Sequence, residues 1–225
     1  MKSIYDALIF LWEKTFDLLY PKQCIICGKQ NKDMVCDECY KQFKREPIIQ
    51  KYNHKNFNEH MYIFKYENII RNLILDYKFN DKAYIYEFFA KIILKNEKIC
   101  RKLKSYDIII PVPIHKKRLK ERGYNQSSLI TKKIALNIEN LNELGSVLIK
   151  IKNNKRQSNL NMYERQENVK QVYKIKNKEK IYNKKIVLFD DIYTTGATAN
   201  ECARVLKENG AKEVLIFTIA KDWKE

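Results

Sequence analysis

The chain has 225 residues, and its 44 Lys and Arg against 27 Asp and Glu give a formal net charge of +17. Hydrophobic residues make up 45% and charged residues 32%, a composition that excludes a disordered or fibrous chain and is typical of a globular protein with a sizeable core. No apolar stretch reaches the roughly 20 residues of a membrane-spanning helix, so we expect no transmembrane segment and a cytoplasmic protein.

Residues 1–20 alternate apolar and charged side chains in the manner of an amphipathic helix. The charges interrupt any apolar core of a signal peptide. We expect the helix to pack on its own protein, with contact to a membrane surface as the alternative.

Two C-x-x-C motifs follow, Cys24 with Cys27 and Cys36 with Cys39, separated by eight residues. Four thiolates at this spacing can surround one Zn²⁺ tetrahedrally, and Gly28 suits the tight turn after the first motif. A redox C-x-x-C or a pair of disulfides are the alternatives. We predict a structural zinc site in an N-terminal lobe, residues 1–50, that precedes a larger domain, residues 51–225.

The polar composition of residues 47–58 predicts a linker or an exposed connection, with His54 and His60 facing solvent. Residues 61–66 carry strand-forming side chains, and residues 69–75 and 84–94 have helical spacing. Aromatic side chains are frequent between residues 77 and 89. They could stack on bases of single-stranded DNA, but their spacing favours a core.

Residues 105–113 predict a buried strand that ends near Pro111, because proline cannot donate ladder hydrogen bonds. The loop that follows continues through Pro113, Ile114 and His115 to a helix near residues 127–137. Arg118 and Arg122, four residues apart, can lie on one helical face and bind phosphate oxygens. His115 is either a proton donor or pyrophosphate contact, or a capping or solvent-exposed residue.

A third short strand is expected at residues 147–151, followed by a long polar segment from Lys152 to Lys170. This basic segment, which includes Arg156, Gln157 and Arg165, is either a lid that closes over a phosphate site or a disordered insertion. Residues 174–185 are expected to form a solvated connection.

Near the end of the chain, four apolar residues run into Asp190 and Asp191, and a Thr-rich turn around Gly196 then opens a helix that ends at Gly210. A run of this length without polar residues predicts a strand buried in a parallel sheet. Such sheets bind ligands at the carboxyl ends of their strands. The turn suits an anion at a helix N-terminus, and the two carboxylates suit hydroxyl groups or a divalent cation. Together these groups indicate a phosphorylated ribose with Mg²⁺. Residues 214–219 predict a last buried strand.

The charge excess is concentrated just upstream of this motif. Residues 106–182 hold 17 basic and 7 acidic residues, whereas residues 183–225 hold 7 of each. Such a surface attracts polyanions, either nucleic acid or a pyrophosphate-bearing metabolite. The alternative is a solvated basic face without a partner.

Residues 186–198 resemble the phosphoribosyl-pyrophosphate (PRPP) loop of type I phosphoribosyltransferases. The resemblance implies that Asp190 and Asp191 hold the ribose hydroxyls during catalysis, and that the loop holds the 5′-phosphate of Mg²⁺-bound PRPP. The loop residues concerned are Thr194, Thr195, Gly196, Ala197 and Thr198. Where 6-oxopurine salvage enzymes carry an Asp, this chain has Thr194, which argues against hypoxanthine or guanine as the acceptor.

Almost from end to end, the chain resembles the ComF family of competence proteins. The matching residues lie at 17–21, Tyr66, Ile74, Lys78-Phe79, 112–115, Arg118, 122–126, Gln157, Leu160, Arg165 and 168–169. The resemblance implies an α/β fold, a type I phosphoribosyltransferase-like parallel sheet flanked by helices, behind a small zinc-binding lobe. The departures are Lys150, Lys152 and Asn154, where family members often carry Arg, Arg and Thr, and Lys cannot bind a phosphate in the bidentate way of Arg.

The family resemblance implies a role in the uptake of single-stranded DNA, beside a DNA-translocating helicase. Under this hypothesis the protein binds PRPP and handles DNA. The alternative is an active phosphoribosyltransferase that transfers ribose 5-phosphate to a nitrogen acceptor, with pyrophosphate neutralised by the loop and the lid at Pro113, Ile114, His115, Arg118, Arg122, Arg156, Gln157 and Arg165. A structural zinc protein with a relict domain is a third interpretation.

Overall fold

A computed structural model describes residues 23–32, 34–52, 55–154 and 162–223. The chain forms two compact units, residues 1–44 and 45–225. The first helix predicted, residues 1–20, lies outside the described residues. Among those described, no helix has the length and apolar character to cross a bilayer.

The described residues of the first unit include the four cysteines and a short helix, α2 (Asp37–Gln42). An antiparallel bridge between Gln23 and Gln30 closes the loop around the first C-x-x-C motif. Cys36 is the N-cap residue of α2, so the second motif spans the first turn of a helix.

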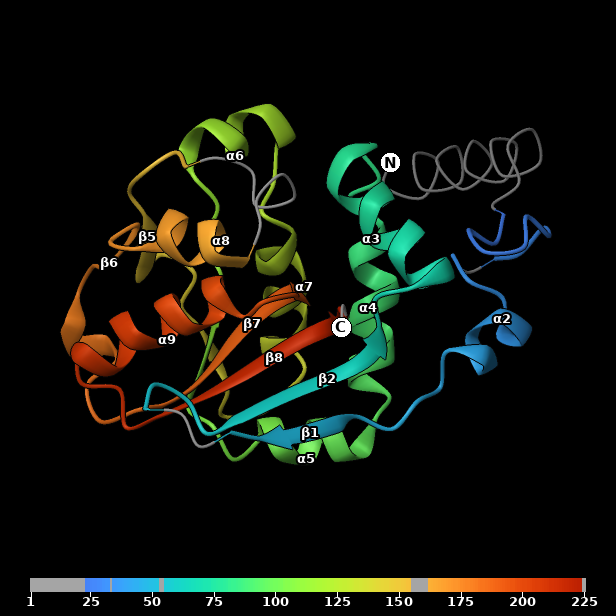
Figure 1. Ribbon diagram of the computed structural model, residues 1–225. Helices are drawn as coiled ribbons and strands as arrows, with labels where there is room; N and C mark the ends of the chain where they lie inside the picture. The colour runs from blue at the N-terminus through green and yellow to red at the C-terminus, as the bar shows by residue number, and fades with distance from the viewer. Residues whose placement is uncertain (1–22, 33, 53–54, 155–161, 224–225) are drawn as a thin grey trace, which may run out of the picture. The chain divides into compact units, whose positions relative to one another are not determined.

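The second unit is built on a six-stranded sheet in the order β1-β2-β8-β7-β3-β4 (Figure 1). Its strands are β1 (Ile48–Lys51), β2 (Glu59–Lys65), β3 (Ile108–Pro111), β4 (Asn142–Glu143), β7 (Lys185–Tyr193) and β8 (Glu213–Lys221). Every pairing is parallel except that of β1 with β2. The predicted α/β sheet is therefore confirmed, and β3 does end at Pro111.

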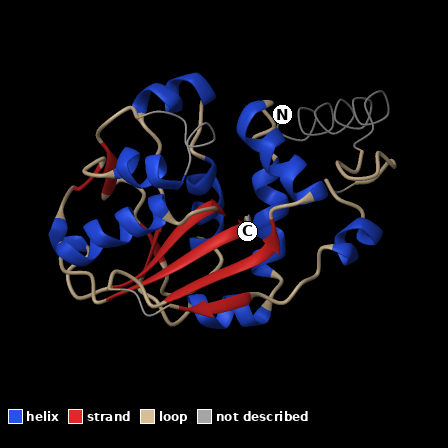
Figure 2. Ribbon diagram, in the orientation of Figure 1, coloured by secondary structure: helices blue, strands red, loops and turns tan. Residues whose placement is uncertain are grey.

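Helices lie on both sides of this sheet (Figure 2). They are α3 (Asn68–Phe79), α4 (Ile85–Leu94), α5 (Glu97–Leu103), α6 (Lys116–Arg122), α7 (Gln126–Ala135), α8 (Met162–Val169) and α9 (Ala197–Glu208), with a 3-10 turn η2 (Lys178–Lys180). A separate two-stranded antiparallel sheet joins β5 (Leu148–Lys150) to β6 (Tyr173–Ile175).

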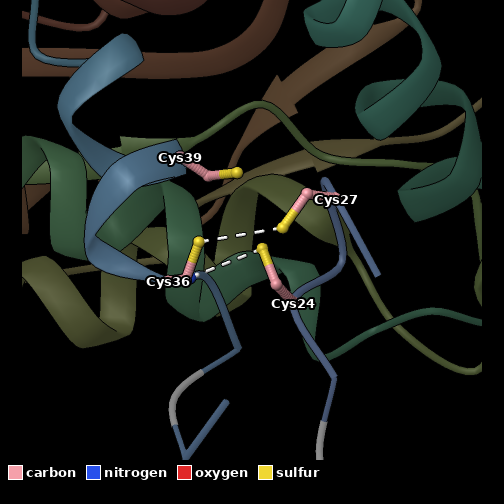
Figure 3. A group of neighbouring side chains, drawn as sticks. All are labelled: Cys24, Cys27, Cys36 and Cys39. Atoms are coloured by element: carbon pink, nitrogen blue, oxygen red, sulfur yellow. Dashed lines mark hydrogen bonds between the residues drawn. The ribbon is translucent and has the colours of Figure 1, made fainter. Parts of the chain in front are cut away.

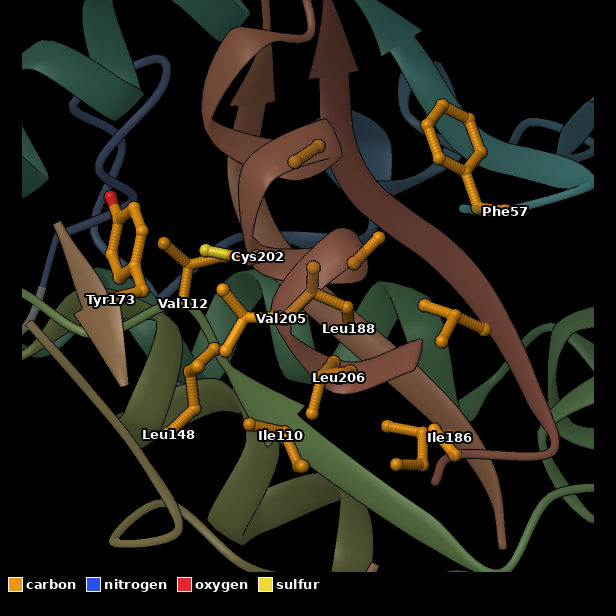
Figure 4. Packing of buried hydrophobic residues seen from close by; sticks show 14 of the residues in the cluster. Phe57, Ile110, Val112, Leu148, Tyr173, Ile186, Leu188, Cys202, Val205 and Leu206 are labelled. Carbon is orange, nitrogen blue, oxygen red and sulfur yellow. The ribbon is translucent and has the colours of Figure 1, made fainter. Parts of the chain in front are cut away.

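The core on the α9 side of the sheet arises from the period-two alternation of the strands. Ile110 of β3 and Leu188 of β7 are at most 1% exposed, and they pack in one cluster with Cys202 and Leu206 of α9 (Figure 4). A central parallel strand is buried on both faces, which accounts for the unbroken apolar run of β7. The apolar side of α9 covers one of these faces.

Three expectations from the sequence were wrong. Residues 47–58 are not only a linker, because β1 lies within them and pairs with β2. This pairing buries His60 completely, whereas we expected it to face solvent; His54 lies outside the described residues. Residues 174–185 are more than a solvated connection, because they contain most of β6 together with η2.

The aromatic residues between 77 and 89 differ in their burial. Tyr77, Phe88 and Phe89 are at most 2% exposed and belong to the core, as their spacing favoured. Phe79 and Tyr84 are 54% and 45% exposed. The core role therefore holds for the buried three.

Candidate functional site

The four cysteines of the first unit converge on one point (Figure 3). All four sulfur atoms lie within 4.8 Å of one another, and Cys27 Sγ lies 3.8 Å from Cys36 Sγ. Sulfur atoms 2.3 Å from a shared tetrahedral Zn²⁺ are about 3.8 Å apart, whereas disulfide sulfurs are bonded at about 2.05 Å. The cysteines are free thiols, so the cluster fits a metal ion and not two disulfides.

The backbone of the first unit prepares this cluster. Gly28 has a φ of +71°, and its N–H donates to the carbonyl oxygen of Cys24 at 2.8 Å, which is the tight turn that the sequence predicted. The backbone N–H of Cys36 points at Cys24 Sγ, 3.4 Å away (Figure 3). Such N–H groups stabilise the thiolate form that a metal requires.

In the second unit, a cleft of about 650 Å³ opens at the carboxyl ends of β3 and β7. It is lined by most of the predicted site residues: Pro113, Ile114, Arg118, Arg122, Asp190, Asp191, Thr194, Gly196, Ala197 and Thr198. The parallel pairing of β3 with β7 brings the two segments together, since Pro111 lies opposite Phe189. Residues that are 78 positions apart in the sequence thus end adjacent strands at one site, and open parallel sheets bind their ligands at the carboxyl ends of their strands.

The acid pair occupies the end of β7. Asp190 Oδ1 accepts hydrogen bonds from Ser127 Oγ at 3.2 Å and from the backbone N–H of Asp191 at 2.9 Å. Burial, followed by the nearby Asp191 carboxylate, raises the pKa of Asp190 to about 7. Near neutral pH this carboxyl group can therefore either donate or accept a hydrogen bond.

Asp191 is held differently, because a lysine from α3 reaches it. Lys78 Nζ lies 2.8 Å from Asp191 Oδ1, with the two side chains 21% and 7% exposed. The sequence matched Lys78 to the ComF family without assigning it a role. This ion pair balances the charge of the Asp191 carboxylate.

The turn after the acid pair opens α9, with Gly196 as its N-cap residue at a φ of +77°. A Cβ atom at Gly196 would lie 2.2 Å from Tyr193 Oη. The Tyr193 ring is in turn stacked on His60 at 4.2 Å between centroids. Only glycine satisfies both the conformation and the close contact, and Gly196 lines the cleft at the N-terminus of the helix, where anions are favoured.

Thr195 and His115 do not line the cleft. Thr195 Oγ1 accepts from the backbone N–H of Ala197 at 3.4 Å, and His115 Nδ1 accepts from the backbone N–H of Lys117 at 3.2 Å. His115 is the N-cap residue of α6. Of its two predicted roles, the structure thus displays the capping one.

The charge on the β3 side comes from α6. Arg118 and Arg122 both line the cleft, as their four-residue spacing predicted. Arg122 lies over the Phe79 ring, 5.4 Å from its centroid, while Arg118 donates to the carbonyl oxygen of Asn154 at 3.2 Å. The second contact ties α6 to the start of the basic segment.

The predicted lid is described in part. Arg156 and Gln157 lie outside the described residues, and Arg165 lies in α8, where the structure describes its backbone alone. Closure over the cleft therefore stays a prediction.

A further cation in the cleft is Lys150 of β5, which the sequence marked only as a departure from the family pattern. Its ammonium lies 5.6 Å from the centroid of the Tyr173 ring. Burial, and then the charge of Arg118, lower the pKa of Lys150 to about 8. The sequence did not identify Lys150 or Gln126 as site residues, because their positions depend on contacts between distant segments.

Comparison with known proteins places these features in context. No family model matches the chain. It is 27% identical to competence protein F of Haemophilus influenzae over 88% of its own length and 96% of that protein. It is 28% identical to competence protein ComFC of Streptococcus pneumoniae, over 93% of the chain and 85% of that protein. It is 27% identical to ComFC of Bacillus subtilis, over 88% of the chain and 77% of that protein.

Two solved structures are similar at low scores. A purine phosphoribosyltransferase from Pyrococcus horikoshii covers 62% of this chain with a TM-score of 0.40 and 15% identity, and 91% of that chain is matched. A phosphoribosylpyrophosphate synthetase from Mycobacterium smegmatis covers 61% with a TM-score of 0.36 and 15% identity, matching 39% of that chain.

The relatives named competence protein F and ComFC match between 88% and 93% of the chain. The comparisons therefore confirm the resemblance to the ComF family of competence proteins.

Proposed function

We propose that the cleft binds PRPP with Mg²⁺ and that the protein acts in the uptake of single-stranded DNA. One observation supports PRPP as the ligand. The acid pair, the turn at the start of α9 and the arginines of α6 all line one cleft. A ribose 5-phosphate needs hydroxyl acceptors beside a phosphate cradle, and the pyrophosphate at its other end needs cations.

In this proposal Thr194 to Thr198 hold the 5′-phosphate, and Asp190 and Asp191 hold the ribose hydroxyls. Arg118 and Arg122 face the pyrophosphate together with the Pro113–Ile114 backbone, and the basic segment with Arg156, Gln157 and Arg165 closes over them. Mg²⁺ would screen the charge of the pyrophosphate. In this proposal the ligand-binding domain is the second unit, residues 45–225, which follows the zinc-binding lobe in the chain.

The names of the relatives support the DNA part of the proposal. Beside the competence proteins, a protein of Salmonella typhimurium named DNA utilization protein YhgH is 26% identical over 66% of this chain. The excess of ten positive charges in residues 106–182 suits a polyanion, with a DNA-translocating helicase as the protein partner. Free thiols suit a reducing compartment, and the cytoplasm is the location that we propose.

Calorimetry tests the ligand. The full chain is titrated with PRPP in the presence and absence of Mg²⁺, beside the double variant Asp190→Asn/Asp191→Asn. We expect the double variant to lose at least tenfold in affinity, because both acceptors of the ribose hydroxyls are weakened. The variant Asp37→Asn, at an exposed position of α2, is the matched control. Unchanged affinity in the double variant would refute the proposed ribose site.

Single-stranded oligonucleotides of mixed sequence test the DNA part by fluorescence anisotropy. Because Lys and Arg would release counterions from the phosphates, affinity is expected to fall steeply between 50 and 200 mM salt. Binding that does not depend on salt, or no binding, would contradict a role of the basic span in DNA handling.

An active phosphoribosyltransferase is the second candidate, favoured by the intact acid pair and its loop. Pyrophosphate release from PRPP is measured across a panel of nitrogen bases and amines. The enzyme hypothesis would be refuted by two results together. The unsubstituted protein would release no pyrophosphate, and salt-sensitive DNA binding would survive the Asp190→Asn/Asp191→Asn change.

We also propose that the metal in the first unit is a structural Zn²⁺. Metal analysis of the purified chain is expected to give one equivalent of zinc, lost in Cys24→Ser/Cys27→Ser because two of four ligands are removed. A full equivalent in that variant would show that the ligands are assigned wrongly.

A further inference from the structure

Gln126, the first residue of α7, has a buried amide group without a partner. The residue is 2% exposed, and among the described residues its Nε2 atom has no hydrogen-bond acceptor. An unmade hydrogen bond at a buried donor costs stability, and such groups are rare in native proteins. A physical reason for its presence is therefore required.

The surroundings of Gln126 are otherwise well satisfied. Asn125 donates to the carbonyl oxygen of Val112 at 3.1 Å, and its Oδ1 caps α7 by accepting from the backbone N–H of Ser127. Tyr77 Oη donates to the carbonyl oxygen of Gln126 at 2.8 Å. The backbone on both sides is thus fixed, and the free donor does not result from a loosely placed segment.

The location of this donor sets it apart. Three other buried side-chain atoms of the described residues have no partner: His60 Nδ1, Tyr62 Oη and Asn154 Oδ1. None of those three residues lines the cleft, whereas Gln126 does. The terminal amide of glutamine rotates readily about its last bond, so Nε2 can turn toward the cleft when an acceptor arrives.

The neighbours of Gln126 indicate which acceptor it meets. On one side, Ser127 donates to Asp190, the residue proposed to hold the ribose. On the other side, the chain leads back through Gly123 to α6, whose Arg118 and Arg122 are two of the cations that line the cleft. Along the chain Gln126 thus lies between α6 and Ser127, and it lines the same cleft as Asp190 and the two arginines. It is also the first residue of a ten-residue helix, where anions are favoured.

We propose that the amide of Gln126 donates a hydrogen bond to an oxygen of the pyrophosphate group of bound PRPP, a contact that distinguishes PRPP from ribose 5-phosphate. This inference rests on the proposed function of the same cleft. Gln126 is therefore a specificity-determining residue, whose unpaired donor is kept for the ligand.

Gln126→Met tests the contact, because methionine has a similar shape and no polar group to satisfy. Affinity of the full chain is measured by calorimetry for PRPP and for ribose 5-phosphate, and thermal stability is measured without ligand. We expect the affinity for PRPP to fall about tenfold, or about 1.4 kcal/mol, and that for ribose 5-phosphate to stay unchanged. The melting temperature should stay the same or rise, because a buried unpaired donor is removed.

Gln126→Glu is the second variant. It keeps the shape and replaces the amide with a carboxylate that repels the pyrophosphate when ionised, so it should again weaken the binding of PRPP more than that of ribose 5-phosphate. Gln42→Met, at an exposed position of α2, controls for the substitution itself.

A lower melting temperature with unchanged affinity for PRPP would overturn the inference, because the amide would then serve the fold. Equal losses for both ligands would overturn it as well, since the contact would be to the ribose. Both results leave the proposed function standing. Failure of the unsubstituted protein to bind either ligand would refute both proposals.

Discussion

Two loops leave neighbouring strands at the same edge of the sheet, and they are built in opposite ways. The loop after β7 has no net basic excess, and its shape depends on backbone geometry around Gly196. The loop after β3 leads into α6, a helix with no buried residue, whose sequence KKRLKER supplies charge. The β7 loop therefore provides shape and the β3 loop provides electrostatic attraction, which predicts different responses to mutation and to salt.

The largest effect is expected from Gly196→Ala, which changes the shape of the β7 loop. A φ of +77° strains any residue with a Cβ, and the new atom would meet Tyr193 Oη. Tyr193 cannot easily withdraw, because it is stacked on His60. We expect a loss of about 3 kcal/mol in the free energy of unfolding, measured in urea, and a more than hundredfold loss in affinity for PRPP.

Gly210→Ala is the matched control for that change. Gly210 has a φ of +94°, and its added Cβ would meet Tyr182, a side chain that is 71% exposed and free to move away. We expect Gly210→Ala to lower the free energy of unfolding by about 1 kcal/mol, the part due to backbone strain alone, and to leave the affinity for PRPP unchanged. Normal PRPP binding by Gly196→Ala would contradict the importance of loop shape.

The next effect concerns the charge balance of the β7 loop, which depends on Lys78 from α3. Lys78→Met leaves Asp191 as an unpaired, 7% exposed carboxylate. We expect a loss of about 2 kcal/mol in the free energy of unfolding. Lys82→Met is the control, because its pair with Asp76 is 42% and 32% exposed and should contribute under about 1 kcal/mol. Equal losses in the two variants would show that Lys78 has no special role.

Arg118→Gln and Arg122→Gln test the β3 side. Each should lower the affinity for PRPP about tenfold, and the loss should shrink as salt rises, because the arginines act by charge. Thermal stability should change little, since α6 buries no residue. Lys116→Gln on the same helix, exposed and outside the cleft lining, is the control. A loss that is the same at 50 and 500 mM salt would show that the arginines act through shape.

The same division explains how much of the site the sequence could predict. The β7 strand, its loop and α9 form a contiguous segment, so their residues and spacing predict both the fold and the placement of Asp190, Asp191 and Gly196. The arginines of α6 were predictable for the same reason. Local pattern is sufficient wherever one segment builds its part of the site.

The remaining groups depend on contacts that no local pattern encodes. Lys78 meets Asp191 across 113 positions, and His60 meets Thr218 across 158 at 2.8 Å. His60 was expected to face solvent because polar residues surround it in the sequence, yet β1 and β8 enclose β2 from both edges. The burial of Lys150 likewise follows from the pairing of β5 with β6. The family matches at Lys78 and Gln126 and the departure at Lys150 were the signals that could have identified these site residues beforehand.

The smallest effect is a pH dependence that only the β7 side should show. The pKa of Asp190 rises from 3.8 to about 7, chiefly through burial and then through Asp191. Between these pH values the folded protein holds a proton that the unfolded chain has released. Unfolding then releases a proton, so the contribution of Asp190 to stability decreases as the pH rises from about 4 to about 7.

Asp190→Asn removes this dependence, and its amide oxygen can still accept the hydrogen bonds of Ser127 and Asp191. We expect the variant and the unsubstituted protein to be equally stable near pH 4, and the variant to be more stable at pH 8 by at least about 1 kcal/mol. Urea unfolding across this range measures the difference, with Asp37→Asn as the control. If Asp190→Asn is destabilised at pH 8, Asp190 is ionised and well paired in the folded protein. The β7 loop would then supply charge as well as shape, and the two loops would differ only in how much charge each one supplies.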